Sequence, residues 1–392
     1  MRTQSEDALR YHVYVIPLRY VNATPPSVAY DGLSITLGAG NIFHIITSCD
    51  FSMIKLSVKD FDGTPILTSA LAVISLSNGM AKYTFTNRGT FYTITYALTT
   101  PTKDATGNTL IENAEQLQNI GRCPSYPPDG QYKQIDDIDL SVISSFKPIG
   151  ETGNPFTGKY DGNDYLIRSL KIRDQPLDVH LGLFRVAQSA TITRVVVIYA
   201  ALYGTESSQV YCGVLVGNSI GATITKSHAW GTIMGGRDNQ AGGLIGGGTG
   251  TVRESYASVD ITGDSQLGGL IGFSRGFTIE NCYATGNVSG YREIGGLVGH
   301  LMLSRLSNSY ATGIVSASAV INPAVHGLVG QKSNNSTVSN SYYPNTRVQS
   351  GIGFMPSEFP GLPANFTKAD FDWDFENTWH WVGNGQWPVF KF

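Results

Sequence analysis

Charged residues are scarce in this chain, and neither sign prevails. They make up 15% of 392 residues, with 27 Lys and Arg against 30 Asp and Glu and a formal net charge of −3 at pH 7. A chain without excess positive charge has no long-range field to hold a nucleic-acid backbone or an anionic membrane surface. The same composition disfavours a disordered, charge-rich chain. We therefore expect an ordered protein that binds neither nucleic acid nor membrane.

Cysteines and long apolar runs are also rare. The four cysteines, at positions 49, 123, 212 and 282, form no CxxC pair and have no nearby His at metal-ligand spacing, so they predict neither a disulfide framework nor a zinc site. The longest apolar run, residues 195–203, is half of what a bilayer-spanning helix needs. Charges within the first ten residues predict no secretory leader there. We expect either that a leader was removed upstream or that the protein reaches its place by assembly, as a virion component does.

Glycine, in contrast, is abundant, with 45 residues in the chain. Residues 1–104 hold seven alternating or apolar runs, separated by turn pairs such as Asp62-Gly63 and Asn78-Gly79. Many short strands at close spacing are typical of a sandwich of two sheets. The sequence predicts an all-β chain that begins with an immunoglobulin-like β-sandwich.

The rest of the chain repeats a short phrase. GVLVG at 213–217 returns as GGLIG at 242–246 and 268–272, GGLVG at 295–299 and HGLVG at 326–330, with a degenerate LGLFR at 181–185. The marker leucines are Leu183, Leu215, Leu244, Leu270, Leu297 and Leu328. A second phrase, such as NSYATG at 308–313, follows each marker from Leu215 onward. Units this short bury a continuous core only by stacking, so we predict a parallel β-solenoid of six coils.

Strand alternation then assigns faces to the columns of equivalent residues. The aliphatic column of Ile279 and the tyrosine column are predicted to share the interior. Alternation would also bury the column of Asn281, but its members include a Lys and a Glu, so we expect a bend or bulge there. Cys282 stands in a column of serines and is expected to fill space rather than react. The tyrosine column comprises Tyr256, Tyr283, Tyr310 and Tyr342, with His228 in the place of one Tyr.

These phrases resemble those of the GLUG-repeat family, named for Gly-Leu-any-Gly, and the resemblance covers about residues 105–392. Segments 110–120 and 155–172 are similar to the region that precedes such arrays, and 371–392 to the region that closes them. The family is known mainly from large bacterial surface and adhesin-like proteins, where the arrays serve as stalks or binding modules. The resemblance implies an extracellular β-solenoid. The predicted parts are the sandwich at 1–104, a lead-in and N-terminal cap at 105–180, the repeats at 181–345 and an aromatic C-terminal cap at 346–392.

Tryptophans gather at the C-terminus. Four of the five lie there, namely Trp373, Trp379, Trp381 and Trp387. Because an open solenoid end exposes strand edges and apolar core, we expect these rings to close the terminal coil. The alternative is a stacking platform for sugars or for a protein partner. The candidate binding residues are these four rings together with Tyr291.

Catalytic residues would have to be acidic. Asp238 and Asp264 lie six residues before their marker leucines in successive coils, and Tyr291 ends that column. Stacked carboxylates come close to the separation that retaining glycoside hydrolysis requires. Glu254 and Glu280 are adjacent but one register apart. For both pairs we expect turn or surface charges, and a polysaccharide-degrading β-helix enzyme that uses Asp238 and Asp264 is the alternative.

Clustered aspartates raise the question of calcium. The clusters are Asp136, Asp137 and Asp139, and Asp372 and Asp374. No EF-hand loop or GGxGxD nonapeptide accompanies them, so we expect them to cap turns. No cofactor is predicted.

The sequence thus predicts a non-enzymatic extracellular or virion protein whose solenoid binds a glycan or a protein partner on a cell surface. A phage fibre, spike or decoration protein and a bacterial cell-surface adhesin are both open. A purely structural appendage subunit that contacts neighbouring subunits, or itself as a homo-oligomer, is a further alternative.

Overall fold

The computed structural model describes residues 101–143, 146–173, 180–204, 211–236, 240–318, 324–344 and 362–391, and elsewhere the backbone of individual strands. The chain divides into two compact units, residues 1–127 with 141–145 and residues 128–140 with 146–392. No helix among the described residues is long and apolar enough to cross a membrane. The described residues are β-strands and loops apart from α1 (Ala114–Asn119) and the 3-10 turns η3 (Leu140–Val142) and η4 (Lys368–Asp370).

The first unit contains two small sheets. One has the order β1-β4-β9-β8-β7 and the other β2-β3-β5-β6. The strands are β1 (His12–Val15), β2 (Ser27–Ala29), β3 (Gly32–Thr36), β4 (Ile42–Thr47), β5 (Leu56–Lys59), β6 (Pro65–Ile66), β7 (Ala72–Ser77), β8 (Met80–Asn87), β9 (Thr90–Leu98) and β10 (Thr109–Ile111). The connections within 1–100 lie outside the described residues, so the immunoglobulin-like arrangement stays a prediction.

One cysteine of this unit corrects the sequence analysis. Cys123 is disulfide-bonded, whereas Cys212 and Cys282 are buried free thiols. Spacing along the chain did not indicate the bond, because pairing depends on which cysteines the fold brings together.

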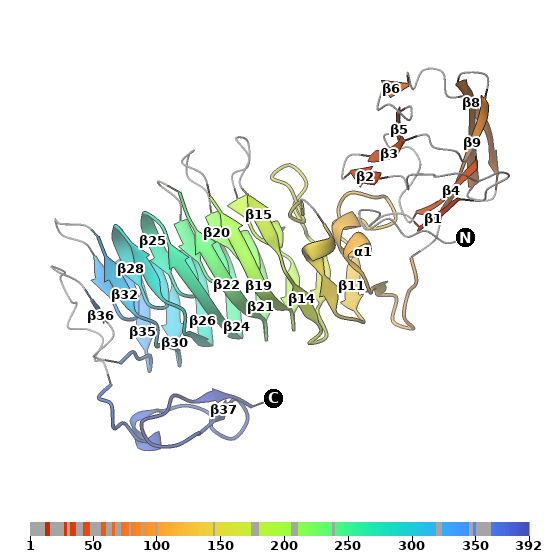
Figure 1. Ribbon diagram of the computed structural model, residues 1–392. Helices are drawn as coiled ribbons and strands as arrows, with labels where there is room; N and C mark the ends of the chain where they lie inside the picture. The colour runs from red at the N-terminus through yellow and green to blue at the C-terminus, as the bar shows by residue number, and fades with distance from the viewer. Residues whose placement is uncertain are drawn as a thin grey trace. The chain divides into compact units, whose positions relative to one another are not determined.

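The second unit is a parallel β-solenoid, as predicted (Figure 1). It has about seven turns, whereas the repeats predicted six coils. Its long sheet begins before the first marker leucine, since β11 pairs with β13 and β13 with β18 in parallel. The strands that precede the bend are β11 (Gln131–Gln134), β13 (Lys159–Asp161), β17 (Phe184–Gln188), β18 (Thr191–Thr193), β21 (Val216–Thr225), β29 (Val298–Met302), β30 (Arg305–Ser307), β34 (Val329–Lys332) and β35 (Thr337–Ser339). β24 (Ile245–Thr262) and β26 (Ile271–Ala284) run through the bend.

The remaining strands complete each coil. After the bend come β12 (Ile138–Asp139), β14 (Leu166–Arg168), β15 (Lys171–Arg173), β19 (Val196–Tyr203), β22 (His228–Met234), β27 (Val288–Gly290), β31 (Tyr310–Ala311), β32 (Val315–Ala317) and β36 (Val348–Gln349). A separate six-stranded sheet holds the residues before the marker leucines: β16 (His180–Leu181), β20 (Tyr211–Gly213), β23 (Gln240–Gly242), β25 (Ser265–Gly268), β28 (Arg292–Gly295) and β33 (Val325–His326). Near the C-terminus, β37 (Trp379–His380) pairs with β38 (Val389–Phe390) in antiparallel.

The marker leucines form the central column of the core. All six are fully buried. The backbone N–H of Leu270 donates to the carbonyl of Leu297 at 2.8 Å, and Leu297 donates to Leu328 at 2.9 Å. Equivalent residues of successive units therefore lie directly over one another, as the repeat predicts.

The predicted bend is present at the Asn281 column. Each member has a positive φ: 51° at Lys226, 48° at Glu254, 51° at Asn281, 49° at Asn308 and 46° at Asn340. A residue in the left-handed region interrupts the alternation of faces along a strand. After the bend, each residue therefore lies on the opposite face of the sheet from the one that simple alternation would assign to it.

This reversal overturns the predicted interior position of the tyrosines. Ala257 faces the interior, because a Cβ added to Gly243 would lie 2.8 Å from its Cβ. Ser255 is also fully buried. Tyr256, which lies between Ser255 and Ala257, must then point away from the solenoid interior, and so must its column.

The serine column is interior, and it does more than fill space. The hydroxyl of Ser255 accepts the backbone N–H of Ser227 at 3.1 Å, and that of Ser309 accepts the N–H of Cys282 at 3.0 Å. The Ser255 hydroxyl also donates to the carbonyl of Arg253 at 2.7 Å. These bonds satisfy backbone groups that the bend removes from the ladder.

Candidate functional site

The outward tyrosines form a stacked ladder along one flank of the solenoid. The rings of Tyr256 and Tyr283 are 4.5 Å apart with planes 5° from parallel, and those of Tyr283 and Tyr310 are 4.9 Å apart at 1°. His228 extends this tyrosine ladder, 4.1 Å from Tyr256. The spacing follows from the coil repeat, since parallel strands lie about 4.8 Å apart.

Residues 362–391, here called the aromatic cover, pack on this ladder. Figure 1 shows this segment, with β37, running beside the solenoid. Trp379 is fully buried, 4.7 Å from Phe390 and 5.9 Å from Tyr310 by ring centroids. The Tyr310 hydroxyl donates to the carbonyl of Pro388 at 2.7 Å, and Trp373 Nε1 donates to the carbonyl of Asn340 at 2.8 Å. The cover thus holds the flank of several coils, whereas the sequence analysis expected it to close the last one.

The predicted binding residues take different positions. Trp373 and Trp379 are buried in packing, whereas Trp381 and Trp387 are partly buried. Tyr291 is 50% exposed and lies apart from the two hollows described next.

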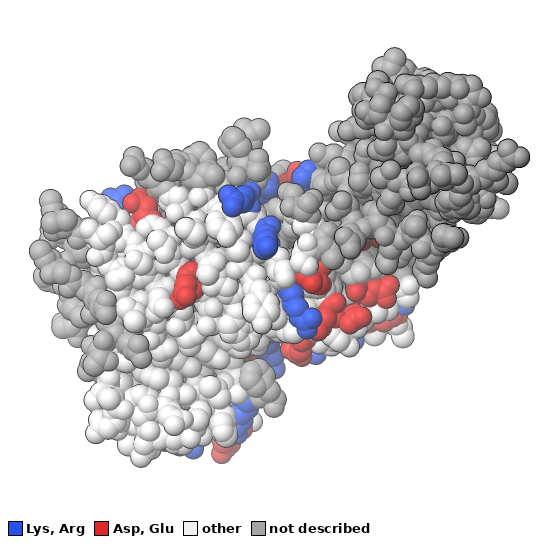
Figure 2. All heavy atoms as spheres, in the orientation of Figure 1, with Lys and Arg blue, Asp and Glu red and all other residues white. Residues whose placement is uncertain are grey.

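A groove of about 1010 Å³ runs between the solenoid flank and the aromatic cover; we call it the flank groove. Its aromatic lining comprises Trp230, Tyr256, Tyr283, Tyr310, Phe366 and Trp387. Its polar side-chain lining comprises Ser258, Thr285, Asn287 and Thr312. No charged side chain lines it among the residues that the structure describes. The solenoid face shown in Figure 2 is likewise mostly uncharged.

Sequence reasoning missed this groove although a signal was present. A small hydroxyl residue follows two positions after the Tyr in SYAS, CYAT and SYAT, giving Ser258, Thr285 and Thr312. The sequence analysis assigned the tyrosines to the interior and gave these hydroxyl positions no face. The bend places both columns outside.

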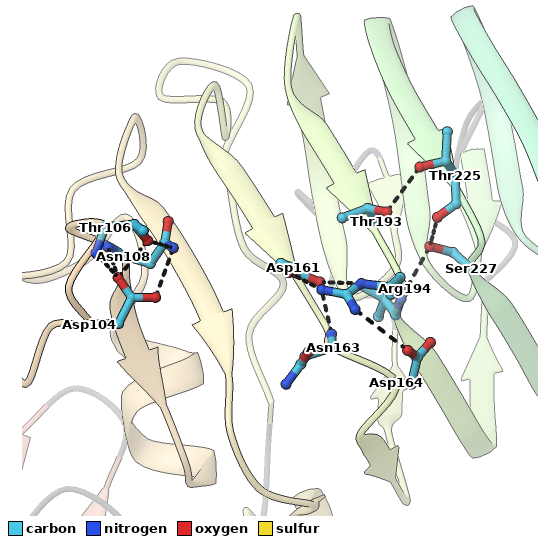
Figure 3. A network of polar contacts seen from close by, with 11 residues as sticks. Asp104, Thr106, Asn108, Asp161, Asn163, Asp164, Thr193, Arg194, Thr225 and Ser227 are labelled. Carbon is cyan, nitrogen blue, oxygen red and sulfur yellow. Dashed lines mark hydrogen bonds and ion pairs between the residues drawn. The ribbon is translucent and has the colours of Figure 1, made fainter.

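A second hollow of about 610 Å³ adjoins the flank groove and shares Trp230 and Tyr256 with it. Unlike the groove, it is lined by charges, including Arg194, Lys226 and Lys391. Figure 3 shows Arg194 between two carboxylates: its Nε is 3.0 Å from Asp161 Oδ1, and its Nη1 is 3.8 Å from Asp164 Oδ2. The positive charge of Arg194 is therefore already balanced by these two carboxylates.

Of the two acidic pairs considered for catalysis, the structure describes both members only of Glu254 and Glu280. Asp238 lies outside the described residues, so its pairing with Asp264 stays a hypothesis. Glu254 Oε2 is 3.6 Å from Lys226 Nζ, and Glu280 Oε2 is 2.9 Å from Arg253 Nε. Each glutamate therefore bonds a basic residue of the neighbouring coil.

The two aspartate clusters differ, because Asp374 bonds its own turn as expected, whereas Asp137 bonds β14 of the next coil. Asp137 Oδ1 accepts the N–H of Leu166 at 2.8 Å, and Asp374 Oδ1 accepts the N–H of Glu376 at 2.9 Å. The backbone N–H and side-chain amide of Asn377, together with the N–H of Glu376, lower the pKa of Asp374 below its usual range. Among the described residues, no group of three or more His, Cys, Asp or Glu could hold a metal ion.

One Ser–His–Glu series was not anticipated. His300 Nε2 is 3.2 Å from Ser333 Oγ, and His300 Nδ1 is 3.1 Å from Glu293 Oε2. His300 is 7% exposed, and none of the three residues lines the flank groove or the charged hollow. Glu293 and His300 flank Leu297 in one coil and Ser333 lies in the next, so the contact between His300 and Ser333 links two coils.

The buried histidines predict that stability falls in mild acid. Burial lowers the pKa of His180, His228 and His326 to about 4. Between pH 6.5 and 4 the unfolded chain binds more protons at these sites than the folded one, so stability is full above pH 6.5 and declines as the pH falls to 4. The loss is ~3 kcal/mol for one such group. Urea midpoints measured from pH 7.5 to 4.5 should show this decline.

His228→Tyr is the matched variant for that experiment. It removes one titrating ring and continues the stack above Tyr256, so the variant should lose less stability over the same pH range. An unchanged pH dependence would show that His228 is not kept neutral by burial.

Comparisons with known proteins agree with this architecture. A model of the GLUG motif matches residues 263–289 and 290–316, which contain Leu270 and Leu297. The chain carries GLUG repeats. The resemblance seen in the sequence is confirmed, and the two matched GLUG repeats lie in the coils between β25 and β32.

Two individual proteins are similar to this GLUG-repeat chain. Over 187 residues, 45% of the chain, it is 32% identical to halomucin of Haloquadratum walsbyi, of whose length it spans only 2%. It also matches the crystal structure of a "putative immunoglobulin A1 protease" from Bacteroides ovatus with a TM-score of 0.55 at 20% identity, covering 74% of this chain and 94% of that one. At this identity the second similarity shows the fold alone.

Proposed function

We propose that this chain is a non-enzymatic surface or extracellular protein that binds carbohydrate in the flank groove. The observation that carries the proposal is the lining itself, which combines the partly buried rings of Trp230 and Trp387 and four buried aromatic rings with neutral hydroxyl and amide groups. Aromatic faces give sugars a large apolar contact, and fixed polar groups provide orientation. This combination suits an uncharged sugar better than a charged ligand.

The extracellular setting has separate support. GLUG repeats and the similarity to halomucin favour a surface or secreted protein. The disulfide at Cys123 fits an oxidising compartment. The carrier would be a cell surface or a virion, such as a phage fibre, and the solenoid would present the groove on its flank.

Loss of groove tryptophans should abolish this binding. Trp387→Ala and Trp230→Ala should each weaken retention on neutral polysaccharides in affinity electrophoresis by about tenfold or more, since stacked aromatics are typical hot spots. Trp381→Ala is the matched control, because Trp381 belongs to the same cover but does not line the groove. Equal retention of all three variants would contradict the proposal.

The enzymatic alternative is tested with the same polymers. We expect no release of reducing ends from any polysaccharide that the chain retains. Release that disappears in Asp264→Asn would instead support hydrolysis by Asp238 and Asp264.

A further inference from the structure

The floor of the flank groove repeats once per coil. Trp230 pairs in register with Ser258, and the pairings Ala257–Ala284 and Ala284–Ala311 place Thr285 and Thr312 next in the same outward column. All four residues line the groove. Along the solenoid axis, a ligand therefore meets one indole and then three hydroxyls, each about 4.8 Å from the last.

Such a row matches a ligand that itself repeats. A linear pyranose chain presents hydroxyl groups along its edge at every sugar unit, so it can offer a partner to each successive member of a row spaced by the distance between parallel strands, about 4.8 Å. A single sugar would use one member of the row and leave the others in water. The volume of about 1010 Å³ reaches the upper end of pocket sizes and exceeds what one monosaccharide fills.

Aromatic rings lie at both ends of this row. Trp387 lies 4.8 Å from Tyr310 and 4.9 Å from Phe366 by ring centroids, so these rings form one aromatic wall. Trp230 stands over Tyr256 in an edge-to-face contact at 5.1 Å, at the other end of the row. Apolar faces at both ends suit a chain whose ring faces and hydroxyl edges both repeat.

The charge of the lining indicates which class of polysaccharide the flank groove favours. The groove lining is neutral, whereas the basic residues Arg194 and Lys226 of the adjoining hollow are engaged by Asp161 and Glu254. A uronate or sulfated chain would lose hydration without gaining a fixed counter-charge in the groove.

We infer that the ligand of the flank groove is a linear, uncharged polysaccharide segment laid parallel to the solenoid axis and held over about three sugar units. This inference rests on the proposed function and adds ligand class, orientation and length. Binding strength should therefore depend on chain length and then become constant.

The test is calorimetry of the full chain with neutral oligosaccharides of one to six units, taken from β-glucan, mannan and chitin series. For the series that binds, affinity should rise about tenfold or more from one unit to three, as contacts are added along the row, and change little beyond four. Thr312→Val should weaken binding of the trimer by about fivefold, because it removes one hydrogen bond to the ligand. It should affect binding of the monomer little, because a single sugar need not contact Thr312.

Thr232→Val is the matched control, because Thr232 is an exposed threonine of β22 outside the groove lining. It should leave all affinities unchanged. Equal affinity for monomer and hexamer, or tighter binding of a uronate polymer such as alginate, would overturn this inference while leaving carbohydrate binding intact. Absence of binding to every carbohydrate would overturn the proposed function as well.

Discussion

Trp379→Ala should release the aromatic cover from the solenoid. Trp379 is fully buried and contacts Trp373 and Phe390 at centroid distances of 4.6 and 4.7 Å, and its Nε1 donates to Asn281 Oδ1 at 3.3 Å. Truncation of a buried Trp costs about 3–5 kcal/mol. Because the cover is a single small segment with little core of its own, we expect this loss to exceed its docking free energy.

Limited trypsin digestion measures the release. Lys368 lies in the cover, and in the variant it should be cleaved at least tenfold faster while the solenoid stays resistant. Val382→Ala is the control, since Val382 is 45% exposed in the same segment and should change nothing. If the Trp379 variant is digested at the wild-type rate, the cover is not held by this ring.

Gly268→Ala should destabilise the solenoid itself. A Cβ at this position would lie 2.0 Å from the carbonyl oxygen of Ile271 and 2.6 Å from the backbone nitrogen of Gly299. Both contacts are backbone, so the coils must move apart to accept the methyl group. Overpacking of this kind costs about 1–3 kcal/mol and more where backbone blocks the group. The urea midpoint of the main transition should fall accordingly.

Gly153→Ala is the control for that experiment. A Cβ there meets nothing within 4 Å, and its φ does not lie in the left-handed region. We expect a neutral or slightly stabilising change, because alanine restricts the unfolded chain. If Gly268→Ala proved as mild as Gly153→Ala, close packing of backbones would not be the reason for glycine before the marker leucine.

The outward position of the tyrosines explains both the packing of the aromatic cover and the presence of the flank groove. A ring column on the interior would only have filled the core, whereas on the flank it creates a surface that the cover must protect. Where the cover departs from the ladder, Trp230, Ser258 and Thr285 are left to line the flank groove. Packing of the cover and formation of the groove are therefore consequences of one bend.

Much of the site was beyond sequence reasoning for the same reason. The bend was predicted because Lys226 and Glu254 could not be buried. The prediction did not include its consequence, which is that the tyrosine column after the bend faces outward. Asp238 and Asp264 were considered as site residues because acidic side chains are typical of catalytic sites. Neutral threonines such as Thr285 and Thr312 are common on any strand and do not indicate a binding site. A groove between the repeats and a segment that follows them in the chain has no local signature in the sequence.

The repeat alone determined the solenoid. Glycine-punctuated units of about 27 residues can bury a core only by stacking, so the column of Leu270 and Leu297 followed from periodicity and was found hydrogen-bonded in register. Only the tertiary structure decided which face the tyrosines occupy and where the C-terminal tryptophans pack. The left-handed residue at Asn281 reverses the strand's faces, and docking of the cover depends on contacts between residues far apart in the chain, which no periodicity encodes.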